Sequence, residues 1–176
     1  MITFVVGGAK SGKSMFAQDL AKALERDNGR LYYIATMNPY DLEDVKRIEN
    51  HLKEREGYGF ETIEETLYME KAAERFNKKD TVLIDSITSL VTNSMFKGME
   101  FIKDVNKSII KGVKEITNKA DNIVIVSDYL FSDSIEYDCY TENFRRELGL
   151  INKEIARVAD VVIECSFGNV IYHKGK

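Results

Sequence analysis

Runs of apolar, β-branched residues recur along the chain and predict buried β-strands. Successive residues within each run are apolar, which is typical of strands covered on both faces in a parallel sheet; a strand with one wet face alternates apolar and polar residues. The six runs are ITFVV at 2–6, LYYIAT at 31–36, TVLID at 81–85, NIVIVS at 122–127, DVVIECS at 160–166 and NVIYH at 169–173.

Three segments between these runs carry apolar residues at every third or fourth position, the spacing that gives a helix one apolar face. They are 41–56, 97–118 and 141–159. In the second segment the repeating positions are Met99, Ile102, Val105, Ile109, Val113 and Ile116. Alternation of strands and helices predicts a doubly wound α/β fold with a mostly parallel sheet.

The last two apolar runs are separated by Gly168-Asn169, a composition typical of a tight hairpin turn. We therefore expect the final strand to lie antiparallel at one edge of the sheet. No internal repeat, low-complexity segment or linker interrupts the sequence, so residues 1–176 are predicted to form a single domain.

The first predicted strand leads into GGAKSGKS, which matches the phosphate-binding pattern G-x-x-x-x-G-K-[ST] and is followed by a helical pattern. Glycines let backbone N–H groups point at a phosphate, Lys13 supplies a cation for the β- and γ-phosphates, and Ser14 offers a hydroxyl to Mg²⁺. The motif predicts a P-loop NTPase-type domain that binds a nucleoside triphosphate through Gly7, Gly8, Ala9, Lys10, Ser11, Gly12, Lys13 and Ser14.

Asp85 ends the third apolar run, at the usual position of a carboxylate that holds Mg²⁺ through water. Any buried strand can end in aspartate, so Asp85 is a candidate metal ligand only because the sequence also contains a phosphate loop. We expect Ser14 and Asp85 to hold Mg²⁺ together. These features alone leave kinase, hydrolase, switch and transferase open.

Composition and charge narrow the choice of partners. Hydrophobic residues make up 44% and charged residues 31% of the sequence, as is ordinary for a globular protein. The net charge of −4 does not favour binding to the negatively charged backbone of a nucleic acid. No apolar run could span a bilayer, the N-terminus lacks a secretory pattern, and the two cysteines form no CxxC pair. We therefore expect a cytoplasmic protein with no nucleic-acid partner and no membrane span.

His51 is one of only two histidines and lies in the predicted helix 41–56. Arg47, His51 and Arg55 are spaced by four residues, which places them on one helix face. Two flanking guanidinium groups would keep the imidazole neutral and nucleophilic, and would attract a triphosphate. From this segment alone, however, a solvated helix face with a chance histidine is the favoured interpretation.

The sequence resembles the bifunctional adenosylcobinamide kinase/adenosylcobinamide-phosphate guanylyltransferases, enzymes of cobalamin biosynthesis, nearly from end to end. After the phosphate loop and YIAT at 33–36, it carries the family pattern D-x-E-x-x-x-R-I-x-x-H, which ends at His51. LIDSITSLVTN at 83–93 and NFRRELGLINKEIARVADVV at 143–162 continue the match. The Arg-Ile-x-x-His helix is much more specific than the phosphate loop.

The resemblance implies that His51 attacks the α-phosphorus of GTP to form a covalent guanylyl-histidine, and that Lys13 serves phosphoryl transfer. It implies a corrinoid, adenosylcobinamide, as acceptor, with GTP and ATP as substrates, Mg²⁺ as the metal, and a homo-oligomer such as the trimers known in the family. Nucleotide contacts outside the phosphate loop are implied for Ala35, Thr36, Met37, Leu52, Lys53, Glu54, Arg55, Glu64 and Asp85.

The match fails after the strand at 122–127, where the family reads Asn-Glu-Val-Gly and this chain has Asp128, Tyr129 and Phe131 at the first, second and fourth positions. This segment is where contacts to the acceptor, or a base for its hydroxyl, are expected. We expect Tyr129 and Phe131 to be core residues, with a wall for a different acceptor as the alternative. Two other functions stay open: a small-molecule kinase in which His51 is idle, and a non-catalytic nucleotide switch or assembly subunit.

Overall fold

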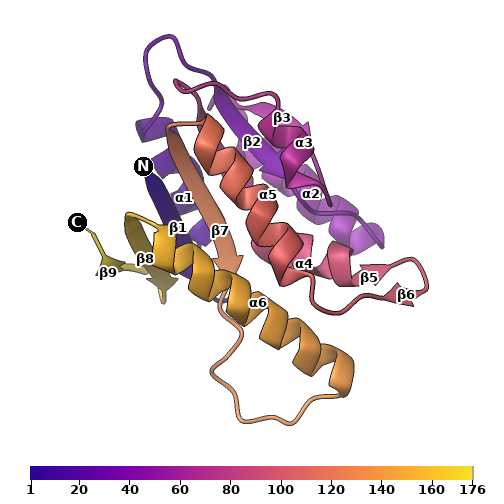
Figure 1. Cartoon of the computed structure of the whole chain (residues 1–176). Coiled ribbons are helices and arrows are strands. Elements are labelled where there is room, and N and C mark those ends of the chain that lie inside the picture. Colours follow the sequence, from indigo (N-terminus) through magenta and orange to yellow (C-terminus); the bar gives the residue numbers. More distant parts are fainter. Residues whose placement is uncertain (176) are drawn as a thin grey trace.

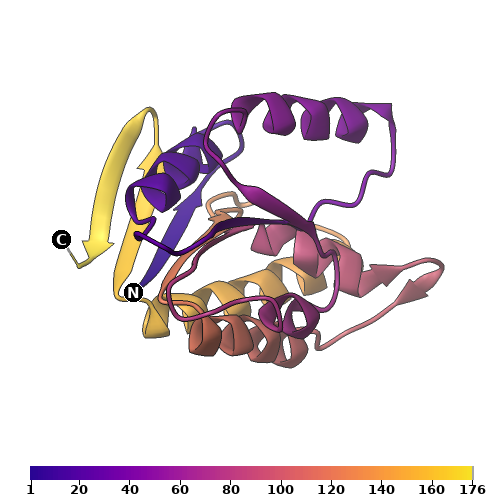
Figure 2. The same cartoon turned by 90° about the horizontal axis from the view of Figure 1, so that it is seen from above.

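One seven-stranded sheet with helices on both faces forms the body of the protein (Figures 1 and 2). The computed structural model describes residues 1–175, and of Arg47 only the backbone. The strand order is β3-β2-β4-β7-β1-β8-β9, and every neighbouring pair is parallel except β8 with β9. The strands are β1 (Ile2–Gly7), β2 (Leu31–Ala35), β3 (Glu61–Glu64), β4 (Thr81–Asp85), β7 (Asn122–Asp128), β8 (Val161–Ser166) and β9 (Asn169–Lys174).

The helices divide between the two faces of this sheet. Figure 2 shows α1 and α2 on one side and the other helices on the opposite side. The bounds are α1 (Lys13–Ala23), α2 (Leu42–Glu54), α3 (Met69–Ala73), α4 (Ile87–Met95), α5 (Asn106–Lys119) and α6 (Cys139–Val158). The predicted doubly wound α/β architecture, with its antiparallel edge hairpin, is confirmed.

Successive strand residues point to opposite faces of the sheet, and this produces two apolar cores. Phe4 and Tyr32 join the core beneath α3, α4, α5 and α6, whereas Val5 and Tyr33 join the core beneath α1. Each fully buried large apolar side chain contributes roughly 1.5–3 kcal/mol of burial free energy. The prediction of strands covered on both faces is therefore confirmed for the centre of the sheet, and it also places Tyr33 on the face that α2 overlies.

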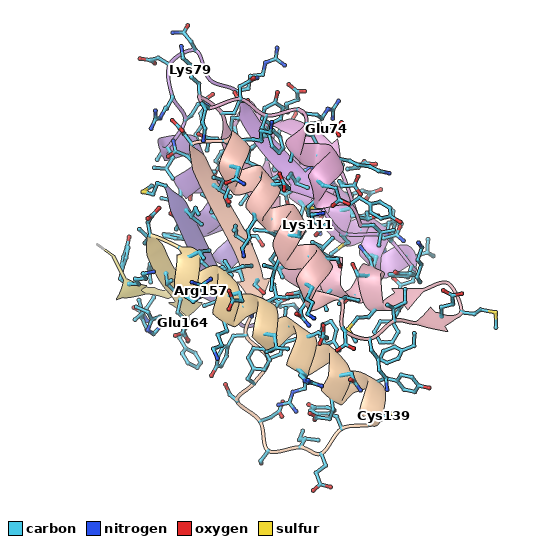
Figure 3. The ribbon with its side chains drawn as sticks, viewed as in Figure 1. Glu74, Lys79, Lys111, Cys139, Arg157 and Glu164 are labelled. Carbon is cyan, nitrogen blue, oxygen red and sulfur yellow. The ribbon has the colours of Figure 1, made fainter. Side chains whose placement is uncertain are left out.

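The long helices α5 and α6 are amphipathic, with apolar residues facing the core and polar residues on the outer surface. α5 buries Ile109, Val113 and Ile116, while Lys111 on α5 and Arg157 on α6 lie on the outer surface (Figure 3). Asp41 is the N-cap of α2, and its side chain accepts backbone hydrogen bonds from the first turn. Helices were predicted at 41–56 and 141–159, and both are found within two residues of those bounds.

The helix predicted over 97–118 is wrong in its first part. The two short strands β5 (Phe96–Lys97) and β6 (Glu100–Phe101) form an antiparallel hairpin there, and α5 begins only at Asn106. The rings of Phe96 and Phe101 pair across this hairpin, with centroids 5.3 Å apart. Glu147 from α6 accepts a hydrogen bond from the backbone N–H of Asn106 at 2.8 Å, which fixes the helix start. The periodicity at Met99 and Ile102 was therefore a coincidence of spacing.

The hairpin between β8 and β9 forms with its turn one residue earlier than predicted. Phe167 and Gly168 both have positive φ angles, 50° and 74°, the backbone pattern of a two-residue type I′ turn. The short elements β3, α3 and α4 were not predicted. Within the described part of the chain, no helix is both long enough and apolar enough to cross a membrane.

Candidate active site

The phosphate loop lies between β1 and α1, as its motif requires. Gly7 ends the strand, and a Cβ built there would lie 2.5 Å from Ser11 Oγ and 2.6 Å from the carbonyl oxygen of Cys165. No larger residue fits without moving the neighbouring strand β8, so glycine is a steric requirement at this position. The helix N-terminus at Lys13 adds its unpaired N–H groups and the positive end of the helix dipole.

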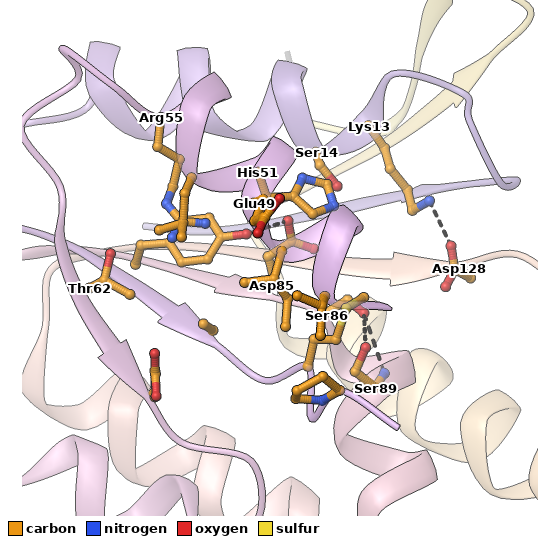
Figure 4. Close-up of a pocket in the computed structure, with 18 residues that line it drawn as sticks. Lys13, Ser14, Glu49, His51, Arg55, Thr62, Asp85, Ser86, Ser89 and Asp128 are labelled. Atoms are coloured by element: carbon orange, nitrogen blue, oxygen red, sulfur yellow. Dashed lines mark hydrogen bonds and ion pairs between the residues drawn. The ribbon is translucent and has the colours of Figure 1, made fainter. Parts of the chain in front are cut away.

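Lys13 is paired with a carboxylate that the motif did not predict. Its Nζ lies 2.6 Å from Oδ1 of Asp128 and donates a hydrogen bond to the carbonyl of Gly8 at 3.1 Å (Figure 4). Asp128 is the last residue of β7, the strand beside β1, and is in register with Gly7. In the sequence, Asp128 could be noticed as a polar residue at the end of an apolar run. That β7 would lie next to β1 in the sheet, and so bring Asp128 to Lys13, could not be predicted from this pattern.

Asp85 ends β4 and is held by a buried phenol. The hydroxyl of Tyr33 on β2 donates a hydrogen bond to Oδ2 of Asp85 at 2.9 Å. Burial, and secondly the negative charge of Asp85, raises the pKa of Tyr33 well above its usual range, so the phenol stays protonated. The guanidinium of Arg55 lies over the same ring, with Cζ 3.8 Å from its centroid.

His51 lies on α2 and pairs with an acidic side chain. Its Nδ1 is 3.1 Å from Oε2 of Glu54, one helical turn further on, and its side chain is 32% exposed. When Nδ1–H of the neutral ring donates to Glu54, the lone pair is left on Nε2. Of the two arginines expected to flank His51, Arg55 turns to the ring of Tyr33, and the side chain of Arg47 lies outside the described residues.

One cavity joins these groups (Figure 4). His51 from α2, Lys13 from the phosphate loop and Asp85 from β4 all face into it. The full lining is Lys13, Ser14, Tyr33, Ala35, Met37, Pro39, Val45, Ile48, Glu49, His51, Leu52, Arg55, Thr62, Glu64, Asp85, Ser86, Ser89 and Asp128. Of the predicted site residues outside the phosphate loop, the cavity brings together Ala35, Met37, His51, Leu52, Arg55, Glu64 and Asp85.

Other predicted site residues do not line this cavity. Thr36 is completely buried, and its hydroxyl donates to the carbonyl of Ser86 and accepts from the N–H of Ser86, both at 2.7 Å. Its place is therefore structural, joining the ends of β2 and β4. Lys53 and Glu54 are exposed on α2, and Glu54 reaches the cavity only through His51. The phosphate-loop residues Gly7, Gly8, Ala9, Lys10, Ser11 and Gly12 are likewise outside the lining.

Both predicted metal ligands line the cavity. The hydroxyl of Ser14 and the carboxylate of Asp85 are hard oxygen donors of the kind that Mg²⁺ prefers. Among the described residues there is no cluster of three or more His, Cys, Asp or Glu side chains that could hold a metal alone. This donor set fits an ion that takes most of its remaining ligands from nucleotide phosphates and water.

The segment after Asp128 provides part of the core and part of the surface. Phe131 packs against the core beneath α6, and a Cβ built on Gly149 would lie 3.6 and 3.7 Å from two of its ring carbons. Tyr129 is 47% exposed and meets Phe131 edge-on. The expectation of a core residue is met by Phe131 and is wrong for Tyr129.

These features define a P-loop nucleotide-binding protein. A glycine-rich loop joins a parallel strand to a helix that begins with a lysine, and a carboxylate ends another strand of the same sheet. Among solved structures, an ATPase domain resembles this chain with a TM-score of 0.56, covering 99% of this chain and 76% of that one. At 14% identity this likeness concerns the fold alone.

The family follows from the sequence comparison. The family model described as cobinamide kinase / cobinamide phosphate guanyltransferase matches residues 3–172, and the chain belongs to this family. Bifunctional adenosylcobalamin biosynthesis protein CobU of Escherichia coli (strain K12) is 27% identical, and that of Salmonella typhimurium (strain LT2) is 29% identical. Both matches cover 92% of this chain and 93% of the relative.

Proposed function

We propose that this protein phosphorylates adenosylcobinamide and then transfers GMP from GTP to adenosylcobinamide phosphate through a guanylyl-histidine at His51. The observation that carries the proposal is the shared cavity, which His51 and the phosphate-loop residues Lys13 and Ser14 line together. A triphosphate held by the loop would therefore have its α-phosphate in the same cavity as the imidazole of His51. The family membership of the chain supports the same pair of reactions.

The guanylyl transfer needs a nucleophilic nitrogen, and the pairing of His51 with Glu54 supplies one. With the Nδ1 proton directed to Glu54, Nε2 of the neutral ring is free to attack the α-phosphorus of GTP. A P–N bond forms, the α–β phosphoanhydride bond breaks, and pyrophosphate leaves. An oxygen of adenosylcobinamide phosphate then attacks the same phosphorus, the P–N bond breaks and adenosylcobinamide-GDP forms, which regenerates the free imidazole.

The phosphoryl transfer uses the other end of the cavity. Backbone N–H groups of the loop and the ammonium of Lys13 hold the β- and γ-phosphates of ATP or GTP and stabilise the charge on the transferring group. The aminopropanol hydroxyl of adenosylcobinamide forms a bond to the γ-phosphorus and gives up its proton to solvent, the β–γ phosphoanhydride bond breaks, and ADP or GDP leaves. Ser14 and Asp85 would hold Mg²⁺, which offsets phosphate charge when bound. Tyr33 keeps the carboxylate of Asp85 oriented, and Arg55, which lines the cavity beside it, offers a cation to the nucleotide.

The test is the intact mass of the protein after incubation with GTP and Mg²⁺. We expect an acid-labile increase equal to one GMP in the wild type and none in His51→Ala. His173→Ala is the matched control, because the only other histidine in the sequence lies on β9 and pairs with Glu164 at 2.8 Å. An adduct that persists in His51→Ala, or no adduct in a wild type that binds GTP, would sink the guanylyl-histidine proposal.

A further inference from the structure

Lys13, the cation on which phosphate binding depends, forms an ion pair with Asp128. The two side chains are only 11% and 24% exposed, and their charged atoms are 2.6 Å apart. Partial burial strengthens such a pair because little water screens it. The charge of Lys13 is therefore already balanced when a nucleotide arrives, and an incoming phosphate has to compete with the carboxylate for it.

Three neighbouring elements hold the backbone of Asp128 in place. Its N–H donates to the hydroxyl of Thr88 in α4 at 2.9 Å, and its carbonyl accepts from Asn152 Nδ2 in α6 at 3.3 Å. The next N–H, that of Tyr129, donates to the carbonyl of Gly7 at 3.0 Å. Only rotation of its own side chain can move the carboxylate, so Asp128 stays beside the phosphate loop when Lys13 changes partner.

The charged side chains that line the cavity are mostly acidic. The cations of this lining are Lys13 and Arg55, and the carboxylates are Glu49, Glu64, Asp85 and Asp128. The described lining thus carries an excess of negative charge, although it is expected to receive a highly anionic triphosphate. Like charges at close range in a partly enclosed site disfavour each other.

We propose that Asp128 is a specificity-determining residue, which restricts the site to nucleotide that arrives already complexed with Mg²⁺. A metal-free triphosphate brings its full negative charge against four carboxylates and has to displace Asp128 from Lys13 without compensation. A metal complex carries less negative charge and does not depend on Lys13 alone. The inference rests on the proposed nucleotide binding at the phosphate loop, but it requires neither guanylyl transfer nor a particular acceptor.

The test measures equilibrium binding of α,β-methylene GTP by calorimetry, once with Mg²⁺ and once with EDTA. The methylene bridge prevents cleavage between the α- and β-phosphates, so no adduct on His51 complicates the binding. Asp128→Asn keeps the shape of the side chain and removes its charge. Asp121→Asn is the matched control, since Asp121 lies next to the opposite end of β7 and pairs with Arg26 at 2.8 Å.

We expect Asp128→Asn to bind the metal-free analogue about tenfold more tightly than the wild type, and to bind the Mg²⁺ complex with a much smaller change. Asp121→Asn should match the wild type in both conditions. An unchanged ratio between the two conditions in Asp128→Asn would overturn the inference alone. No binding by the wild type even with Mg²⁺ would overturn the nucleotide proposal and this inference together.

Thermal melting of each variant verifies that it is folded before binding is measured. Asp128→Ser, which is smaller and also uncharged, repeats the comparison and replaces Asp128→Asn if the latter does not fold. The same gain in metal-free binding is expected for Asp128→Ser. A gain in Asp128→Asn and none in a folded Asp128→Ser would attribute the effect to the asparagine amide, and a gain in Asp128→Ser alone would attribute it to the smaller side chain; either result would also overturn the proposal.

Discussion

The hydroxyl of Tyr33 donates a hydrogen bond to Oδ2 of Asp85 at 2.9 Å, across the neighbouring strands β2 and β4. Tyr33 is almost fully buried, and the guanidinium of Arg55 covers its ring. The bond fixes one oxygen of the carboxylate and leaves the other free of this constraint. The orientation of the proposed Mg²⁺ ligand therefore depends on a side chain that need not touch the metal.

Tyr33→Phe should weaken metal binding without removing a metal ligand. Because outer-shell hydrogen bonds typically contribute tenfold or more to metal affinity, we expect the Mg²⁺ concentration that half-saturates nucleotide binding to rise about tenfold. Tyr58→Phe is the matched control, since its hydroxyl donates to Asp19 on α1 and Tyr58 does not line the cavity. Equal Mg²⁺ requirements in the two variants would contradict the assigned role of Tyr33.

The pKa of Tyr33, raised first by burial and then by the charge of Asp85, makes stability depend on pH in the alkaline range. An unfolded chain loses the phenolic proton above a pH of about 10, whereas the folded protein retains it. The unfolded state then binds fewer protons, so the free energy of unfolding falls as pH rises from about 9 to 11. Urea unfolding across this range should show a steeper fall for the wild type than for Tyr33→Phe.

Glu54 should affect guanylylation through the orientation of His51. Glu54→Ala removes the acceptor at Nδ1, so the ring can rotate or carry its proton on Nε2, and we expect adduct formation to slow by about tenfold or more. Glu54→Gln retains a carbonyl acceptor and should recover most of the rate. Rapid quenching followed by intact-mass analysis measures this.

The neighbouring Glu56→Ala is the control for that series, because Glu56 is exposed just beyond the end of α2. It removes the same charge from the same surface and should leave the rate unchanged. If Glu54→Gln were as slow as Glu54→Ala, the negative charge rather than hydrogen bonding would be the contribution of Glu54.

Gly7 and Gly8 should respond differently to the same substitution. A methyl group on Gly7 would lie 2.5 Å from Ser11 Oγ and 2.6 Å from a backbone oxygen, whereas one on Gly8 would meet nothing within 4 Å. Gly7→Ala should therefore lower the free energy of unfolding by roughly 1–3 kcal/mol, the typical cost of overpacking. Gly8→Ala should stay within about 0.5 kcal/mol of the wild type. Denaturant unfolding of the free protein measures both.

Much of this architecture could be read from local patterns, because the physics behind them is local. The apolar runs predicted the buried strands since a strand covered on both faces has no polar alternation to show. The motif at Gly7 to Lys13 predicted the phosphate loop because its glycines, lysine and following helix are consecutive in sequence. Asp85 could be singled out for the same reason, as the polar end of an apolar run.

Where a local pattern was compatible with two structures, the prediction from the sequence was wrong or could not decide between them. Met99 and Ile102 fit a helical repeat, yet the pairing of Phe96 with Phe101 and the capping of α5 by Glu147 favour a hairpin there. The helical spacing of Arg55 suggested a flank for His51. Packing of α2 over the sheet instead offers it the ring of Tyr33.

By itself, the sequence determined six of the seven strands of the main sheet, the phosphate loop and the family, because each depends on consecutive or regularly spaced residues. Tertiary structure alone decided that Asp128 meets Lys13, that Tyr33 holds Asp85, and that His51 shares a cavity with the loop. Those contacts depend on which strands become neighbours and on where α2 settles over the sheet. Both outcomes arise from burial summed over the whole chain, which no short segment of it records.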